Sequence, residues 1–453
     1  MRYPTQGIAY TYFVGTLALF LAQVLFGVLA GLVYVWPNFL AVLVPFNILR
    51  MIHINALIVW LLLGFFGATY YLIPEEAERD IHSPRLAYLQ FWIWIVAVAV
   101  CVVGYLFRIH EGREFLEQPV YVKVALTVSV LIFLYNISLT VLRGRRTAVT
   151  SVLLLGLWGA AVFFLFAFYD PANLVVDKIY WWWVVHLWVE GVWELIMAAV
   201  LAYLLVKVTG VDREVVEKWL YVVVSLSLSS GLLGTGHHYL WIGTPGYWKW
   251  LGDVFGTLEV LPFFAMVLWA FYLAYQGGRD HPNKAALLWS LGCPVMAFFG
   301  AGVWGFMHNL HVVNYYTHGT QVTAAHGHLA FYGAYVTVNL AIITYAMPSL
   351  RGLTPFNQAL NMWSFWILSS AVAFMTFTLT FAGVVQTHMQ RVVGGYSYMD
   401  VQDQLGFFYW MREGAGIVVL IGAVLFVYSV LGPVREQLTA ADVARQPGLE
   451  PAE

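Results

Sequence analysis

Charged residues are scarce in this chain. They make up 10% of its 453 residues, against about 25% in an ordinary soluble domain, while hydrophobic residues make up 61%. This balance excludes a soluble globular protein and indicates a polytopic membrane protein. The net charge of −2 gives no indication of nucleic-acid binding.

Cysteine is also nearly absent. Cys101 and Cys293 each lie in or beside an apolar segment, which excludes a disulfide framework and a cysteine metal site. The sequence contains no CxxCH heme-attachment motif, and no connection is long enough to fold as a separate domain. The first apolar segment has no small-residue cleavage site, so we interpret it as a retained span.

Long apolar segments are what the chain has in abundance. Windows of about 20 residues predict about twelve spans, beginning near residues 10, 50, 87, 120, 148, 181, 215, 252, 285, 320, 360 and 411. The predicted fold is therefore all-α, with one transmembrane helical domain over residues 1–435 and a polar cytoplasmic tail over residues 436–453. Lysine and arginine are more numerous on the side of the N-terminus, 14 against 8, which places both termini in the cytoplasm.

The segment WWWVVHLWVEGVWELIMAAV, residues 181–200, is apolar enough to cross a bilayer but carries three ionisable side chains. His186, Glu190 and Glu194 are spaced four apart, so they share one face of a helix. Ionisable groups at such depth are costly, and their default interpretation is a functional site. A histidine with a carboxylate four residues later can also hold one metal ion.

Six histidines on four spans share one predicted depth, near the outer ends of their spans: His53, His186, His237, His238, His326 and His328. Scattered core histidines would not share a level. The adjacent His237 and His238 point about 100° apart on a helix, so both reach one metal only near a helix end or across a wide angle. With His186 and Glu190 they predict a metal site.

His326 and His328 are two residues apart and face nearly opposite sides of their helix. They cannot easily share one metal, but each can ligate a heme on its own side, and His53 is the natural second ligand for one heme. Any one of these alone would more often be a hydrogen-bonded helix histidine. The HxH spacing and the shared depth favour heme ligation.

Glu259, in FGTLEVLPF, opens the eighth span at the same level. With Glu194 it forms a second tier of carboxylates. Buried carboxylates near a metal can hold protons when desolvated and then deliver them. The alternative is a salt-bridged or water-facing acid, which the scarcity of nearby basic residues disfavours.

Five motifs together resemble the catalytic subunit of cytochrome c-dependent nitric oxide reductases, within the heme–copper oxidase superfamily. They are HLWVEGVWELIM, GTGHHYLWIG, GREFLEQP, GAGVWGFMH and YYTHGTQVTAAHGH, and the resemblance extends from PFNILRMIH to FYWMREGAG. It implies the twelve-span heme–copper oxidase architecture. It also implies an enzyme that reduces two nitric oxide molecules to nitrous oxide and water.

The resemblance implies a role for each motif residue. The implied heme ligands are His53 and His328 for a low-spin heme b and His326 for a high-spin heme b. The implied ligands of a non-heme iron are His186, His237, His238 and Glu190. The implied catalytic carboxylates are Glu190, Glu194 and Glu259. Oxygen-reducing members have a tyrosine where this chain has Glu190, and an added carboxylate oxygen suits iron where imidazole suits copper.

Arg113 and Glu114, in the outer loop HEGREFLEQP, could simply be solvated charges. The resemblance implies instead that Glu114 ligates a calcium ion bridging the heme propionates and that Arg113 contacts a propionate. Calcium takes hard oxygen ligands, so a carboxylate beside propionates suits it.

Electrons must come from a partner, because the chain has no heme-attachment motif and no soluble domain. The resemblance implies a membrane-anchored cytochrome c subunit, fed by a soluble c-type cytochrome or a cupredoxin. It also implies the bacterial inner membrane, with the active site and the proton supply toward the periplasm. Two alternatives stay open: a heme–copper-type oxygen reductase and, from a different class, a proton-coupled transporter, which would lack heme bands.

Overall fold

The computed structural model describes residues 1–40, 43–277, 281–352 and 356–433, and the tail predicted for residues 436–453 lies outside them. Within these ranges the chain forms helices and no strand. Twelve helical segments of the described chain are long and apolar enough to cross a membrane. The all-α fold with twelve spans is therefore confirmed.

The bounds of the spans follow the apolar windows closely. In chain order they are Pro4–Val35, Phe46–Glu76, Pro84–Leu106, Val120–Leu142, Ala148–Phe168, Leu174–Thr209, Arg213–Tyr239, Tyr247–Gly277, Lys284–Asn309, Gln321–Leu350, Gln358–Val393 and Gly406–Leu431. The sixth span, expected near residue 181, begins at Leu174, and this is the largest difference from the predicted starts.

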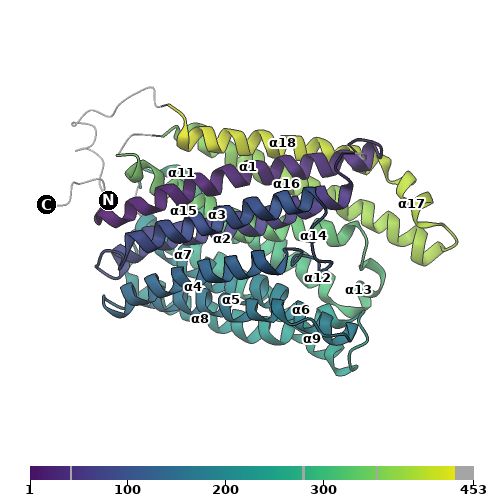
Figure 1. Cartoon of the computed structure of the whole chain (residues 1–453), viewed down its shortest axis with the longest axis horizontal. Coiled ribbons are helices and arrows are strands. Elements are labelled where there is room, and N and C mark those ends of the chain that lie inside the picture. The colour runs from purple at the N-terminus through teal and green to yellow at the C-terminus, as the bar shows by residue number, and fades with distance from the viewer. Residues whose placement is uncertain (41–42, 278–280, 353–355, 434–453) are drawn as a thin grey trace.

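The helices lie side by side along the long axis of the molecule (Figure 1). The N-terminus and the end of α18 (Gly406–Leu431) are at one end, which we call the inner end. The short helices α13 (His311–Thr317) and α17 (Tyr398–Gln404) are at the opposite end, which we call the outer end. α1 (Ile8–Val35) packs against both α2 (Phe46–Glu76) and α18.

Three spans are much more buried than the others. In the second, sixth and tenth spans, 83% of the most apolar window is inside the protein, against at most 56% in any other span. Those three spans carry Glu190 and four of the six histidines that were predicted to share one depth. These ionisable residues therefore lie on the helices that neighbouring helices shield most from lipid, where such residues are normally found.

Four of the described spans contain a π-helical segment. Span six consists of α6 (Leu174–Leu187), the π segment η3 (Trp188–Val192) and α7 (Trp193–Thr209). The π segments η5 (Phe298–Trp304) and η6 (Tyr332–Val336) interrupt spans nine and ten, and η7 (His388–Val393) ends span eleven. Such segments are rare and often mark functional sites. Here η3, η5 and η6 each lie beside a predicted ligand or contain one, whereas η7 contains none.

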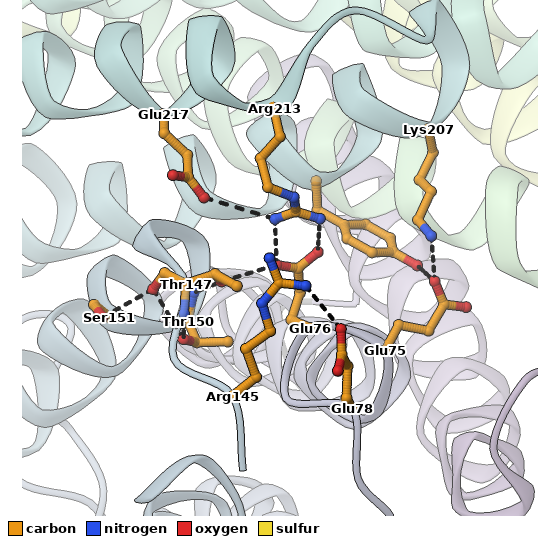
Figure 2. Close-up of polar contacts among 11 residues, drawn as sticks. Glu75, Glu76, Glu78, Arg145, Thr147, Thr150, Ser151, Lys207, Arg213 and Glu217 are labelled. Atoms are coloured by element: carbon orange, nitrogen blue, oxygen red, sulfur yellow. Dashed lines mark hydrogen bonds and ion pairs between the residues drawn. The ribbon is translucent and has the colours of Figure 1, made fainter.

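Carboxylates at the inner end are matched with cations (Figure 2). Arg213 donates to both carboxylate oxygens of Glu76, over 2.7 and 2.8 Å, and the Thr147 hydroxyl donates to one of them. Glu75 accepts from Lys207 and forms an ion pair with it. We call Glu75, Glu76, Lys207 and Arg213 the paired cluster; it joins α2 to α7 and to α8 (Arg213–Gly234).

Candidate metal centre

His237 and His238 lie at the outer end of span seven. Two adjacent residues can reach one metal ion at such a helix end. α8 tightens there into a 3₁₀ turn, η4 (Thr235–Tyr239), which contains His237 and His238. The two rings are 4.1 Å apart between centroids, and each is 5.0 Å from the ring of His186. The three imidazoles thus converge from two spans.

Glu190 completes the group. One carboxylate oxygen, Oε2, lies 3.3 Å from Nδ1 of His186 and 3.6 Å from Nε2 of His237, and Oε1 lies 3.9 Å from Nε2 of His238. One ligand atom from each of these four residues lies within 4.8 Å of the other three. Three imidazole nitrogens and one carboxylate oxygen are therefore gathered closely enough to hold one metal ion.

The surroundings orient the imidazoles. Nε2 of His186 bonds to the backbone carbonyl of Gly231 at 2.8 Å, which leaves Nδ1 facing Glu190. Nδ1 of His186 and Nε2 of His238 are buried and have no hydrogen-bond partner in the described chain. The His238 ring stacks on Trp182 at 3.7 Å with an angle of 11°. Metal-ligating histidines are normally held in this way through the other nitrogen or ring face.

Glycines on α8 make room for the carboxylates. A Cβ at Gly231 would collide with the backbone carbonyl of Glu190, and a Cβ at Gly234 would collide with Oε1 of Glu259. α8 therefore approaches both acids more closely than any side-chain-bearing residue would allow. Gly231 and Gly234 therefore allow Glu190 and Glu259 to lie close to the histidines.

Glu194 and Glu259 form a buried second tier. Their exposed fractions are 1% and 4%, and both oxygens of Glu194 lack a hydrogen-bond partner among the described residues. Oε1 of Glu259 lies 3.6 Å from Nε2 of His186, and its Oε2 accepts from Asn309 at 3.5 Å. The structure thus brings Glu259 to the metal group, as its predicted level required.

A second histidine pair joins the second and tenth spans. The rings of His53 and His328 are 6.4 Å apart between centroids. Two in-line metal–nitrogen bonds of about 2 Å and two ring radii of about 1 Å span about 6 Å, so the separation fits two imidazoles on opposite sides of one iron. Nδ1 of His53 donates to Gln23 and Nδ1 of His328 to Ala324, both to backbone carbonyls. Each Nε2 can then serve as the ligand atom.

His326 has the same local arrangement. Its Nδ1 donates to the backbone carbonyl of Gly300 at 3.1 Å, a residue of the π segment η5, and this leaves Nε2 as the ligand atom. Its ring centroid is 6.1 Å from that of His308, a histidine to which the sequence assigned no role. His308 bonds to Thr317 and Thr323, so its hydrogen-bonding capacity is already used.

The outer-loop charges are paired with protein groups. Glu114 forms an ion pair with Arg50, and its side chain is 42% exposed. Arg113 pairs with Asp177 at 2.5 Å and donates to the carbonyl of Ala167. Both residues lie at the outer end, as expected, but neither touches the metal group.

Sequence reasoning missed Gly231, Gly234 and Asn309. The glycines had a signal, because positions 231, 234 and 238 fall on one face of a helix that ends in the histidine pair. Asn309 had none, since its contact with Glu259 joins residues 50 positions apart.

Comparison with known proteins identifies the family to which this fold belongs. Residues 7–418 match the family described as cytochrome c and quinol oxidase polypeptide I. A solved heme–copper terminal oxidase has the same fold, with a TM-score of 0.75 at 14% identity over 96% of this chain and 86% of that one. The chain belongs to this family of heme–copper oxidase catalytic subunits.

Two relatives show to which group of the superfamily the chain is more similar. It is 54% identical over 450 residues to the B subunit of the nitric oxide reductase of Stutzerimonas stutzeri, with 95% of each chain covered. It is 24% identical to a cytochrome c oxidase subunit 1 homolog of Agrobacterium tumefaciens, with 95% of this chain and 84% of that one covered. Within the superfamily the chain therefore groups with the nitric oxide reductase, and the resemblance predicted from the motifs is confirmed.

Proposed function

We propose that the chain is the catalytic subunit of a nitric oxide reductase, which converts two nitric oxide molecules, two electrons and two protons into nitrous oxide and water. The observation that carries this proposal is the carboxylate of Glu190 within 3.9 Å of three imidazoles. A carboxylate oxygen beside imidazoles suits iron, where imidazoles alone suit copper. The relative at 54% identity supports the same activity.

The four residues of the metal group would hold a non-heme iron: His186, His237, His238 and Glu190. When bound beside a heme iron, such an ion supplies positive charge that stabilises the negative charge developing as two nitrogen atoms join. The protein contributes the convergence of the imidazoles, the fixed ring orientations and a site shielded from lipid.

Electrons would reach the site through hemes held by the histidines of α14 (Gln321–Phe331). His53 and His328 fit a low-spin heme b, and His326 is positioned as the ligand of a high-spin heme b. Because His326 and His328 are two residues apart on one helix, the two hemes would be held close together. A membrane-anchored cytochrome c subunit at the outer end, fed by a soluble c-type cytochrome or a cupredoxin, would be the immediate donor.

Protons would pass through Glu194 and Glu259. Both are buried, neither forms an ion pair with a described lysine or arginine, and Glu259 reaches His186 directly. Their depth favours proton entry from the outer end, which the distribution of lysine and arginine predicts to face the periplasm. Proton uptake from the cytoplasmic side of vesicles would contradict this route.

The outer loop would complete the heme environment. Glu114 offers a half-exposed carboxylate to a calcium ion at the propionates, in competition with its ion pair to Arg50. Arg113 is held by Asp177 at the same end, where a propionate would be its further partner.

The decisive experiment uses the purified complex. We expect anaerobic consumption of nitric oxide with half as much nitrous oxide formed, two hemes b by absorbance, and one non-heme iron by metal analysis. Copper without non-heme iron, together with fast oxygen consumption, would identify an oxygen reductase instead. A preparation with no heme bands would leave a transporter as the better explanation.

A further inference from the structure

One hydrogen bond links two of the π segments. Tyr335, in η6 of span ten, is 4% exposed, and its hydroxyl donates to the backbone carbonyl of Val189 in η3 of span six. Its ring also packs edge-on against Trp193 with centroids 5.3 Å apart. This hydroxyl is therefore buried in a single hydrogen bond to the backbone of the helix that carries Glu190.

The accepting carbonyl belongs to the peptide unit directly before Glu190. A peptide unit is planar, so the direction of the Val189 carbonyl sets the direction of the Glu190 N–H and limits rotation of the Glu190 backbone. Glu190 has φ −114° and ψ 20°, the one residue in η3 without helical angles. These backbone angles direct the Glu190 side chain toward the histidines of the metal group.

The peptide unit after Glu190 is constrained as well. Its carbonyl oxygen presses against Gly231 of α8, which has no Cβ to obstruct it. Tyr335 thus holds one side of the irregular turn, and α8 limits the other side.

We propose that Tyr335 is a positioning residue that fixes Glu190 as a metal ligand through the carbonyl of Val189. The inference rests on the proposed function, because it concerns the ion that Glu190 would hold. Tyr335 does not touch that ion or the substrate. Its effect passes through the backbone of span six.

The test compares Tyr335→Phe with Tyr332→Phe in the complete complex. Tyr332 lies in the same π segment and is similarly buried, but its hydroxyl bonds to Ser369 on α16 (Gln358–Thr387) at 2.8 Å, in a different span. Each substitution removes one oxygen atom. Non-heme iron per heme is measured before and after incubation with EDTA, and the low-spin heme spectrum is recorded.

Loss of a partner that orients a metal ligand typically weakens metal affinity 10- to 100-fold. We therefore expect Tyr335→Phe to lose iron to EDTA at least about tenfold more readily than the wild type, while Tyr332→Phe retains it. Both variants should keep the low-spin heme spectrum. In a Glu190→Gln background, Tyr335→Phe should add little further loss, because two residues acting through one contact are not additive.

Three results would overturn the inference. Tyr335→Phe could retain iron as the wild type does, its effect could add fully to that of Glu190→Gln, or it could lose the low-spin heme as well, which would show a general structural role. A wild-type complex without non-heme iron would instead refute the proposed function itself, so the two failures are distinguishable.

Discussion

Two groups of buried carboxylates in contact with span six differ in whether a lysine or arginine pairs with them. At the inner end, Glu75 and Glu76 meet Lys207 and Arg213 in the paired cluster (Figure 2). Three carboxylates at the metal group and its second tier form no ion pair with an arginine or lysine of the described residues, and we call them the unpaired carboxylates: Glu190, Glu194 and Glu259. Burial does not distinguish the groups, since Glu76 is 3% exposed and Glu194 is 1% exposed.

The difference shows that the partner of a buried acid, and not its depth, indicates its role. An ion pair with complete hydrogen bonding adds little net stability but is costly to break, so it fixes how helices join. A buried carboxylate without a cation is unfavourable unless it is protonated or bound to a metal ion. The paired cluster is therefore a structural joint, and the unpaired carboxylates are suited to metal and proton chemistry.

Glu190→Gln should have the largest effect on activity. The amide keeps the size of the side chain but removes the charge that the metal group would use, so nitric oxide turnover should fall about 100-fold or more. Turnover and the low-spin heme spectrum should be measured on the same sample. The spectrum should be unchanged, and full activity would show that Glu190 behaves like the paired carboxylates.

Gly234→Ala should reduce nitric oxide turnover less than Glu190→Gln does. The added methyl group would displace Glu259, whose carboxylate supplies the two nearest atoms, and a loss of about tenfold in turnover is expected. Gly414→Ala is the matched control, because a Cβ there meets no atom within 4 Å. Equal turnover of the two variants would remove Glu259 from the proton route.

Glu76→Gln should leave turnover per intact complex unchanged but weaken the protein. Arg213 would lose a charged hydrogen-bond partner, which typically costs about 2 kcal/mol. Thermal unfolding in detergent, followed by heme absorbance, should show a lower midpoint. Lys218→Ala removes an exposed ion pair with Glu214 on the same helix and should change neither property. A loss of turnover in Glu76→Gln with unchanged stability would contradict a purely structural role of the paired cluster.

Much of the fold could be predicted from sequence, because a bilayer demands long apolar helices. The shared depth of His53, His186 and His326 followed from span lengths and orientation alone. The His237–His238 pair was expected near a helix end for geometric reasons, and it stands in a 3₁₀ turn there.

What could not be predicted depends on contacts between distant parts of the chain. The partners of the paired cluster are more than 130 positions apart, as in Lys207 with Glu75. The π segment around Glu190 has no proline or other clear local signal, and its brace, Tyr335, is 146 positions away. The ion pair of Glu114 with Arg50 was likewise invisible, since both residues look like solvated charges in the sequence.

The most direct test of the central claim is an experimental density map of the complex with anomalous data at the iron and copper edges. We predict an iron ion bound by three imidazoles, with an oxygen of Glu190 within bonding distance of it. An ion with a copper signal, or Glu190 turned away from an ion held by histidines alone, would contradict it.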